Sequence, residues 1–166
     1  MSYIVIGNII MLAGSCAQVL SGFAKTKKTS LIWQTIQNII MAIGGLVLGS
    51  IPCAIITTFM TVRNILEHKN WLNEKVKAIL IISASVISVA MNNCGWIGLI
   101  PIIAFAISTM GISTKDVAKF KAVTATTCAL FFVNDVLIKA YTSAIFNIIS
   151  IGTNLYRAYK TKKAIA

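Results

Sequence analysis

Residues 3–28 read YIVIGNIIMLAGSCAQVLSGFAKTKK, an apolar stretch that runs directly into a basic loop. The same succession recurs along the chain, whose apolar segments cover residues 3–24, 31–49, 51–66, 76–92, 95–111, 120–138 and 140–158. An α-helix needs roughly 17–25 residues to cross a bilayer, and these segments lie in or just below that range. The pattern therefore predicts an all-α membrane protein with seven transmembrane helices.

The basic residues predict the orientation of these helices. Fourteen of the fifteen Lys and Arg residues follow the first, third, fifth and seventh segments, and the remaining gaps hold only Lys139. Because positively charged loops stay in the cytoplasm, the N-terminus is expected outside and the C-terminus inside. The formal net charge of +11 then reflects loops beside an anionic bilayer, so lipid is the expected partner and nucleic acid is not.

The composition excludes a soluble domain. Apolar residues make up 57 % of the chain and charged residues only 11 %, whereas a soluble domain has about 25 % charged residues. Almost no sequence remains outside the apolar segments and their short loops. We expect a compact multi-pass protein.

The first and last three segments repeat one pattern of lengths and loop charges. A shift of ninety positions aligns residues 3–70 with residues 93–160 without a gap. This predicts a first three-helix bundle within 1–70, a loop and linker helix within 71–92, and a second bundle with a basic tail within 93–166. Both triplets begin outside, so we expect two parallel bundles that face each other.

Polar side chains form one stripe in the third segment and one in the seventh. Thr57 and Asn64 share a helix face, as do Asn147, Ser150 and Asn154. The shift of ninety places Thr57 on Asn147 and Asn64 on Asn154. Polar residues at membrane depth are costly unless they face protein or water, so the two stripes are interpreted as walls of a central pathway. Hydrogen bonding between packed helices is the alternative.

The second segment adds Gln37 and Asn38 near its inner end, where they are expected at the mouth of the pathway. Neutral amides and hydroxyls donate and accept hydrogen bonds without binding an ion tightly. This chemistry favours a small polar uncharged solute as the cargo.

Three further features carry separate expectations. Asp135 stands four residues before Lys139, which favours an ion pair near the outer interface over a proton or cation site. Pro101 lies inside the fifth segment, where it predicts either a hinge or tolerated curvature. Gly45 and Gly49 form a GxxxG motif, which indicates close helix packing within the chain or contact with a second copy.

The residues for catalysis or metal binding are missing from the pattern. The single His68 lies in a basic loop, and the four cysteines show no CxxC spacing. We therefore expect no enzyme activity, no catalytic residue, no structural metal and no cofactor.

A spaced set of residues resembles the YgjV family of bacterial inner-membrane proteins, which implies that location. The set comprises Gly14-Ser15-Cys16-Ala17-Gln18, Lys25-Thr26-Lys27-Lys28, Gln34, Gln37-Asn38, Gly44-Gly45, Gly49 and Arg63-Asn64, with a weaker continuation through Leu99-Ile100-Pro101.

The arrangement of three, one and three helices is similar to SWEET, PQ-loop and PnuC-type transporters. In SWEETs an asparagine on each of the third and seventh spans contacts sugar, and here Asn147 matches one of them while Thr57 stands at the other. The resemblance implies alternating access for a small solute. A non-transporting scaffold or accessory subunit is the alternative, and vitamin or nucleoside uptake would need an aromatic at depth, for which Trp33 is the nearest.

Overall fold

The computed structural model describes residues 2–163, which form seven α-helices and no strand. The helices are α1 (Tyr3–Phe23), α2 (Lys27–Val47), α3 (Ile51–His68), α4 (Glu74–Ala90), α5 (Leu99–Gly111), α6 (Val117–Leu137) and α7 (Tyr141–Lys163), and a 3-10 turn, η1 (Gly95–Gly98), precedes α5. The predicted all-α class is confirmed for these residues. Residues 164–166 of the predicted tail lie outside them.

Three helices, α1, α2 and α6, are long and apolar enough to cross a membrane, and Gly95–Gly111 forms a shorter apolar helix. The other helices fall short for identifiable reasons. α4 has 17 residues, while α3 and α7 bury polar residues such as Asn64 and Asn147 that lower their mean hydropathy. Length and composition thus bear out three of the seven predicted spans.

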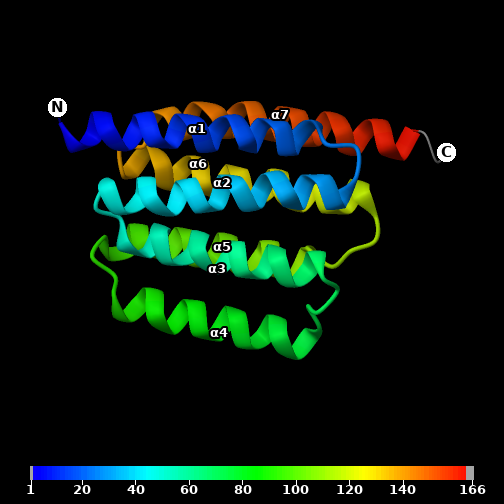
Figure 1. Cartoon of the computed structure of the whole chain (residues 1–166), viewed down its shortest axis with the longest axis horizontal. Helices are drawn as coiled ribbons and strands as arrows, with labels where there is room; N and C mark the ends of the chain where they lie inside the picture. The colour runs from blue at the N-terminus through cyan, green and yellow to red at the C-terminus, as the bar shows by residue number, and fades with distance from the viewer. Residues whose placement is uncertain (1, 164–166) are drawn as a thin grey trace.

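The helices lie side by side along one long axis, and the beginning of α1 and the end of α7 lie at opposite ends of the molecule (Figure 1). The loops 24–26, 69–73 and 112–116 lie at the same end as the last turn of α7, whereas the turns 48–50, 91–94 and 138–140 lie at the other end (Figure 1). Lys25, Lys69 and Lys115 therefore gather at one end of the molecule. Lys139 alone stands in a turn at the opposite end.

Six of the helices close into a ring. α1 packs on α2, α2 on α3, α3 on α5, α5 on α6, α6 on α7 and α7 on α1. The first and last three helices consequently meet along two seams, α1 with α7 and α3 with α5. α4 packs on α3 and α5 outside this ring.

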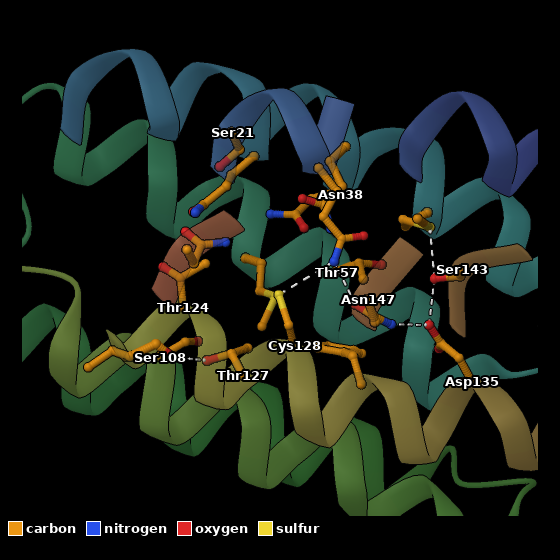
Figure 2. Close-up of a pocket in the computed structure, with 18 of the residues that line it drawn as sticks. Ser21, Asn38, Thr57, Ser108, Thr124, Thr127, Cys128, Asp135, Ser143 and Asn147 are labelled. Atoms are coloured by element: carbon orange, nitrogen blue, oxygen red, sulfur yellow. Dashed lines mark hydrogen bonds between the residues drawn. The ribbon is translucent and has the colours of Figure 1, made fainter. Parts of the chain in front are cut away.

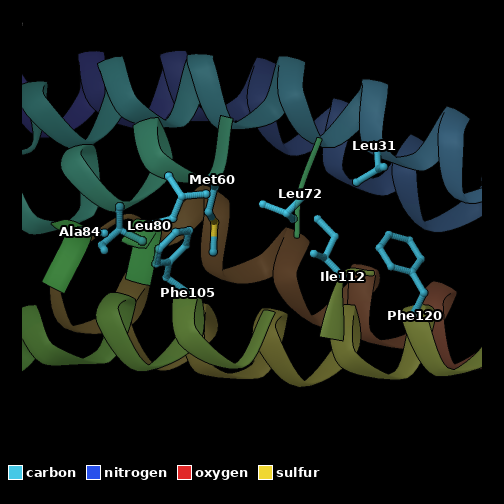
Figure 3. Close-up of a cluster of buried hydrophobic side chains, with 9 residues drawn as sticks. Leu31, Met60, Leu72, Leu80, Ala84, Phe105, Ile112 and Phe120 are labelled. Carbon is cyan, nitrogen blue, oxygen red and sulfur yellow. The ribbon is translucent and has the colours of Figure 1, made fainter. Parts of the chain in front are cut away.

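The apolar core lies where α4 covers the seam between α3 and α5. Ala84 of α4 and Phe105 of α5 are fully buried there, together with Met60 of α3 (Figure 3). The Phe105 ring also stacks edge-on against Phe59, with 6.3 Å between ring centroids. Burial of these side chains holds the linker helix against both halves of the ring.

The ninety-residue relation holds for both ends of α2 and α6 and for the first residues of α3 and α7, but not for α1 and α5. Adding ninety to the bounds of α2, Lys27–Val47, gives those of α6, Val117–Leu137, and α3 and α7 begin at Ile51 and Tyr141. The preceding turns also correspond, because Gly49 and Lys139 both have positive φ, 77° and 64°. The N-caps match as well, since Thr26 caps α2 and Asp116 caps α6.

Two sequence expectations change with these bounds. α5 begins at Leu99, so Pro101 lies in its first turn, where a missing N–H breaks no bond inside the helix; the structure gives no mid-helix hinge there. α2 ends at Val47, so Gly49 lies in the following turn and shares no helix face with Gly45. Gly45 instead packs within the chain, against Cys53 and Ala54 of α3.

Candidate functional site

A cavity of 70 Å³ lies inside the ring and is lined by residues from α1, α2, α3, α5, α6 and α7. A single water needs roughly 10–15 Å³ of such space, so the cavity has room for several waters or a small solute. Its wall mixes amides and hydroxyls with Met, Phe and Cys side chains. Asn38, Thr57 and Asn147 face one another across it (Figure 2).

Five of the seven residues predicted for the pathway line this cavity, namely Gln37, Asn38, Thr57, Asn147 and Asn154. The other two, Asn64 and Ser150, are fully buried and stand outside its wall. The amide oxygen of Asn64 accepts hydrogen bonds from the guanidinium of Arg63. The Ser150 carbonyl accepts one from Asn154 Nδ2 at 2.8 Å.

The lining positions correspond between the two halves of the chain. Seven pairs of them are related by ninety residues: Gln18 and Ser108, Gln34 and Thr124, Gln37 and Thr127, Asn38 and Cys128, Met41 and Phe131, Cys53 and Ser143, and Thr57 and Asn147. Equivalent helix faces of the two halves therefore enclose one space. Thr57 of one polar stripe and Asn147 of the other both line this space, and their role as walls of a pathway stays a prediction.

One end of the cavity holds a carboxylate within a hydrogen-bond network. Asp135 of α6 accepts hydrogen bonds from Ser143 Oγ at 2.5 Å and Asn147 Nδ2 at 2.8 Å (Figure 2). It accepts a third from Asn134 Nδ2 at 3.1 Å. Asn147 Oδ1 in turn accepts from Gln18 Nε2 of α1 at 2.5 Å. The network thus runs from α6 through α7 to α1, across one of the two seams.

The expected ion pair between Asp135 and Lys139 is replaced by this network. Such a pair needs one continuous helix through both residues. α6 ends at Leu137, and Lys139 follows in a turn with φ of 64°. Lys139 is exposed, whereas Asp135 is buried and lines the cavity.

Two buried cations join the halves at the opposite, basic end. Arg63 of α3 donates to Ser108 Oγ of α5 at 2.5 Å. Lys121 of α6 donates to the Ser21 carbonyl of α1 at 2.6 Å and to Ser30 Oγ of α2 at 3.1 Å. Each bond links a helix of the first three to a helix of the last three.

Sequence reasoning counted Arg63 and Lys121 as loop charges and assigned no pathway role to Gln18. The helix ends could have corrected the first error, since an Asp116 cap places Lys121 in the second turn of α6. Gln18 was detectable as an isolated amide in an apolar segment. Its contact with Asn147 depends on packing between the ends of the chain.

The arrangement of polar groups suits hydrogen bonding to a solute. Gln18 Oε1 and Asn154 Oδ1 belong to lining residues and have no hydrogen-bond partner in the described residues. Free acceptors of this kind can receive hydroxyl or amide hydrogens from a guest. No group of three metal-ligating side chains occurs within residues 2–163.

Comparison with known proteins supplies a family. Residues 5–165 match Imp-YgjV, a family described as bacterial inner membrane protein. No curated protein and no solved structure matches the chain. Since the match spans nearly the whole sequence and agrees with the apolar helices α1, α2 and α6, this chain belongs to the Imp-YgjV family of bacterial inner membrane proteins.

Proposed function

We propose that this protein is a facilitator that carries a small polar uncharged solute across the bacterial inner membrane through the central cavity. The observation that carries the proposal is the cavity wall, in which seven pairs of equivalent positions from the two halves surround one polar space. Transporters built from repeats bind their cargo at the interface between the repeats. A scaffold would need no cavity there.

In this proposal all seven helices cross the membrane, with the N-terminus outside and the C-terminus inside. The support is the outward face of each helix, which exposes large apolar side chains: Ile9, Ile43, Ile65, Ile82, Ile103, Val133 and Ile148. Lipid is the solvent that accommodates such a surface. The loops with Lys25, Lys69 and Lys115 would then face the cytoplasm.

Transport would proceed by rocking of two three-helix bundles about the seams α1–α7 and α3–α5. The bonds of Arg63 and Lys121 cross between the bundles at the basic end, so inward opening has to break them. Glu67 strengthens the same end, because it binds Lys27 at 2.5 Å and accepts from Ser113 at 2.9 Å. The structure thereby resembles a state that is closed toward the cytoplasm.

Vitamin or nucleoside uptake is less well supported. Trp33, the aromatic residue expected at depth for such a cargo, does not line the cavity. Phe120 and Phe131 place aromatic rings in the wall, but they offer no hydrogen bond to the polar groups of a vitamin or nucleoside. The cavity volume also favours a cargo smaller than a nucleoside.

Counterflow in proteoliposomes tests the proposal. Vesicles are loaded in turn with unlabelled glycerol, ribose, glucose or glycine, and uptake of the labelled compound is followed. We expect transient accumulation of at least one neutral compound, which Thr57→Val reduces and Thr58→Val leaves unchanged. Both threonines bond to backbone carbonyls of their own helix, but only Thr57 lines the cavity.

Equal effects of the two valine substitutions would place the transport route elsewhere. Absence of counterflow for every compound would favour the scaffold function, provided that the purified protein is folded.

A further inference from the structure

The four acidic residues of the chain have very different surroundings. Glu67 is paired with Lys27, and Glu74 lies on the surface beside Lys77. Asp116 caps the N-terminus of α6. Asp135 alone lines the cavity, two residues before the end of α6 and therefore at the end opposite to the basic loops.

Asp135 is buried without a positively charged partner. Neither of the two ion pairs in residues 2–163 includes it, although the side chain is only 3 % exposed. Its three hydrogen bonds come from neutral groups of Ser143, Asn147 and Asn134. A carboxylate at membrane depth is expensive in this state and becomes stable when it gains a positive charge.

The charged and titratable groups around Asp135 are few. Cys53 faces it from α3 and Cys128 from α6, whereas α1, α2 and α7 present the neutral side chains of Gln18, Asn38, Met41, Ser143 and Asn147. Arg63 also lines the cavity, but it follows Cys53 by ten residues of α3, about 15 Å along the helix axis. A positive charge for Asp135 must therefore come from the cavity itself.

The network links Asp135 to the proposed solute site. Asn147 lines the cavity and donates to Asp135 Oδ2, while its own oxygen accepts from Gln18 of α1. A proton on Oδ2 adds a donor to an oxygen whose two present partners, Ser143 Oγ and Asn147 Nδ2, both donate to it. Ser143 can reverse its hydroxyl to accept, whereas an Asn147 amide displaced by the proton frees its N–H for a solute and loses the bond that spans the α1–α7 seam.

We propose that Asp135 binds and releases one proton in each transport cycle, so that solute movement is coupled to proton movement. The carboxylate takes the proton from water at the outer side and becomes a neutral acid while the solute is bound. It returns the proton to water at the inner side. The coupling depends on the transport function proposed above, but proton binding can be tested without knowledge of the cargo.

Infrared difference spectra between about pH 8 and about pH 5 provide this test, because the ordinary range of an Asp carboxyl lies below both values. A protonated carboxyl group absorbs apart from carboxylates and amides, and a chain with four acids gives an assignable band. We expect a band from a buried carboxyl group that is lost in Asp135→Asn, retained in Glu74→Gln and displaced in Asp135→Glu. A band that persists in Asp135→Asn, or none in the wild type, would overturn proton binding.

The conformational link is measured with Cys128 as the only thiol, after Cys16, Cys53 and Cys94 are replaced by Ala. Cys128 lines the cavity and accepts a hydrogen bond from Gln18. The rate at which maleimide labels Cys128 is measured in this single-thiol protein and in its Asp135→Asn variant, and the ratio of the two rates is followed between about pH 8 and about pH 5. We expect this ratio to change roughly threefold, because protonation of Asp135 shifts the populations of the two conformations. A constant ratio would remove the link between protonation and the seam.

Two further arms identify the ion and separate the two proposals. If added NaCl shifts the pH at which the infrared band of Asp135 titrates, sodium competes for the carboxylate, and the site is a sodium site rather than a proton site. In vesicles that contain a pH-sensitive dye and no solute, a compound that shows counterflow should acidify the interior when it is added outside to the wild type, and should not do so with Asp135→Asn. Net solute uptake without acidification of the interior would reject coupling while transport stands, whereas proton binding without counterflow would reject transport.

Discussion

The hairpin of α2 and α3 and the hairpin of α6 and α7 share one backbone and differ in chemistry. At a shift of ninety residues, both ends of α2 match those of α6, the first residue of α3 matches that of α7, and the turns between the helices correspond. Where the second hairpin carries Asp135, Ser143 and Asn147 in a connected network, the first carries Gly45, Cys53 and Thr57. The comparison indicates that equivalent positions of both hairpins line the cavity, while only the second hairpin supplies its carboxylate.

Transfer of the acid to the first hairpin should have the largest effect. Gly45→Asp places a carboxylate beside Cys53 and Ala54, where the hydrogen-bond donors of the second hairpin are missing. An unpaired buried charge costs about 3–5 kcal/mol, which is roughly 10 °C in the unfolding temperature of a chain of this size. Thermal unfolding in detergent measures it.

Gly45→Ala is the matched control for this substitution. A Cβ at Gly45 would lie 3.4 Å from the Ala54 nitrogen and 3.6 Å from Cys53, which is ordinary contact. We therefore expect nearly wild-type unfolding for the alanine. If Gly45→Asp and Gly45→Ala unfold at the same temperature, the first hairpin tolerates a buried charge, and the proposed contrast between the two hairpins is wrong.

Removal of the equivalent polar residues should cost more in the second hairpin. Asn147→Val removes one hydrogen bond from Asp135 and one from Gln18, and a buried polar group that loses its partner costs about 1–3 kcal/mol. Thr57→Val removes only bonds to the carbonyls of Cys53 and Ala54 in its own helix. Chemical unfolding should show a loss for Asn147→Val that clearly exceeds the loss for Thr57→Val.

The two turns allow the smallest and most local test. Lys139 holds a positive φ of 64° at the position that Gly49 occupies, with φ of 77°, in the first turn. Left-handed backbone costs an ordinary L-residue about 1 kcal/mol relative to glycine. Lys139→Gly should therefore raise the unfolding temperature slightly, and Gly49→Ala should lower it. If Lys139→Gly lowers the unfolding temperature and Gly49→Ala raises it, the two turns are not equivalent.

Much of the fold was accessible from the sequence because apolar length and turn composition are local signals. The segment predicted at residues 120–138 corresponds to α6, Val117–Leu137. The break predicted between this segment and the one at 140–158 lies within the observed turn between α6 and α7. The segment predicted from residue 31 in fact begins at Lys27, because the Thr26 side chain caps the first turn. The capping residue therefore determines where the helix begins, whereas hydropathy alone predicts a start four residues too late.

The site was accessible only in part, because its key contacts join distant residues. Thr57 and Asn147 were predicted as opposite walls from their equivalent positions, and both line the cavity. Asn64 was expected beside them, but the neighbouring Arg63 engages its oxygen. Gln18 and Asn147, which form a hydrogen bond, are 129 residues apart in the sequence, so no local sequence pattern predicts their contact.

The account depends most on a cavity that solvent reaches from each side of the membrane in turn. Single cysteines at positions 57 and 58, in a background in which all four native cysteines are alanine, measure this with a small charged thiol reagent applied to either face of the vesicles. We predict that Thr57→Cys reacts from both faces and Thr58→Cys from neither. If Thr57→Cys stays unreactive from both faces of a folded protein, the cavity is closed packing and the transport proposal is contradicted.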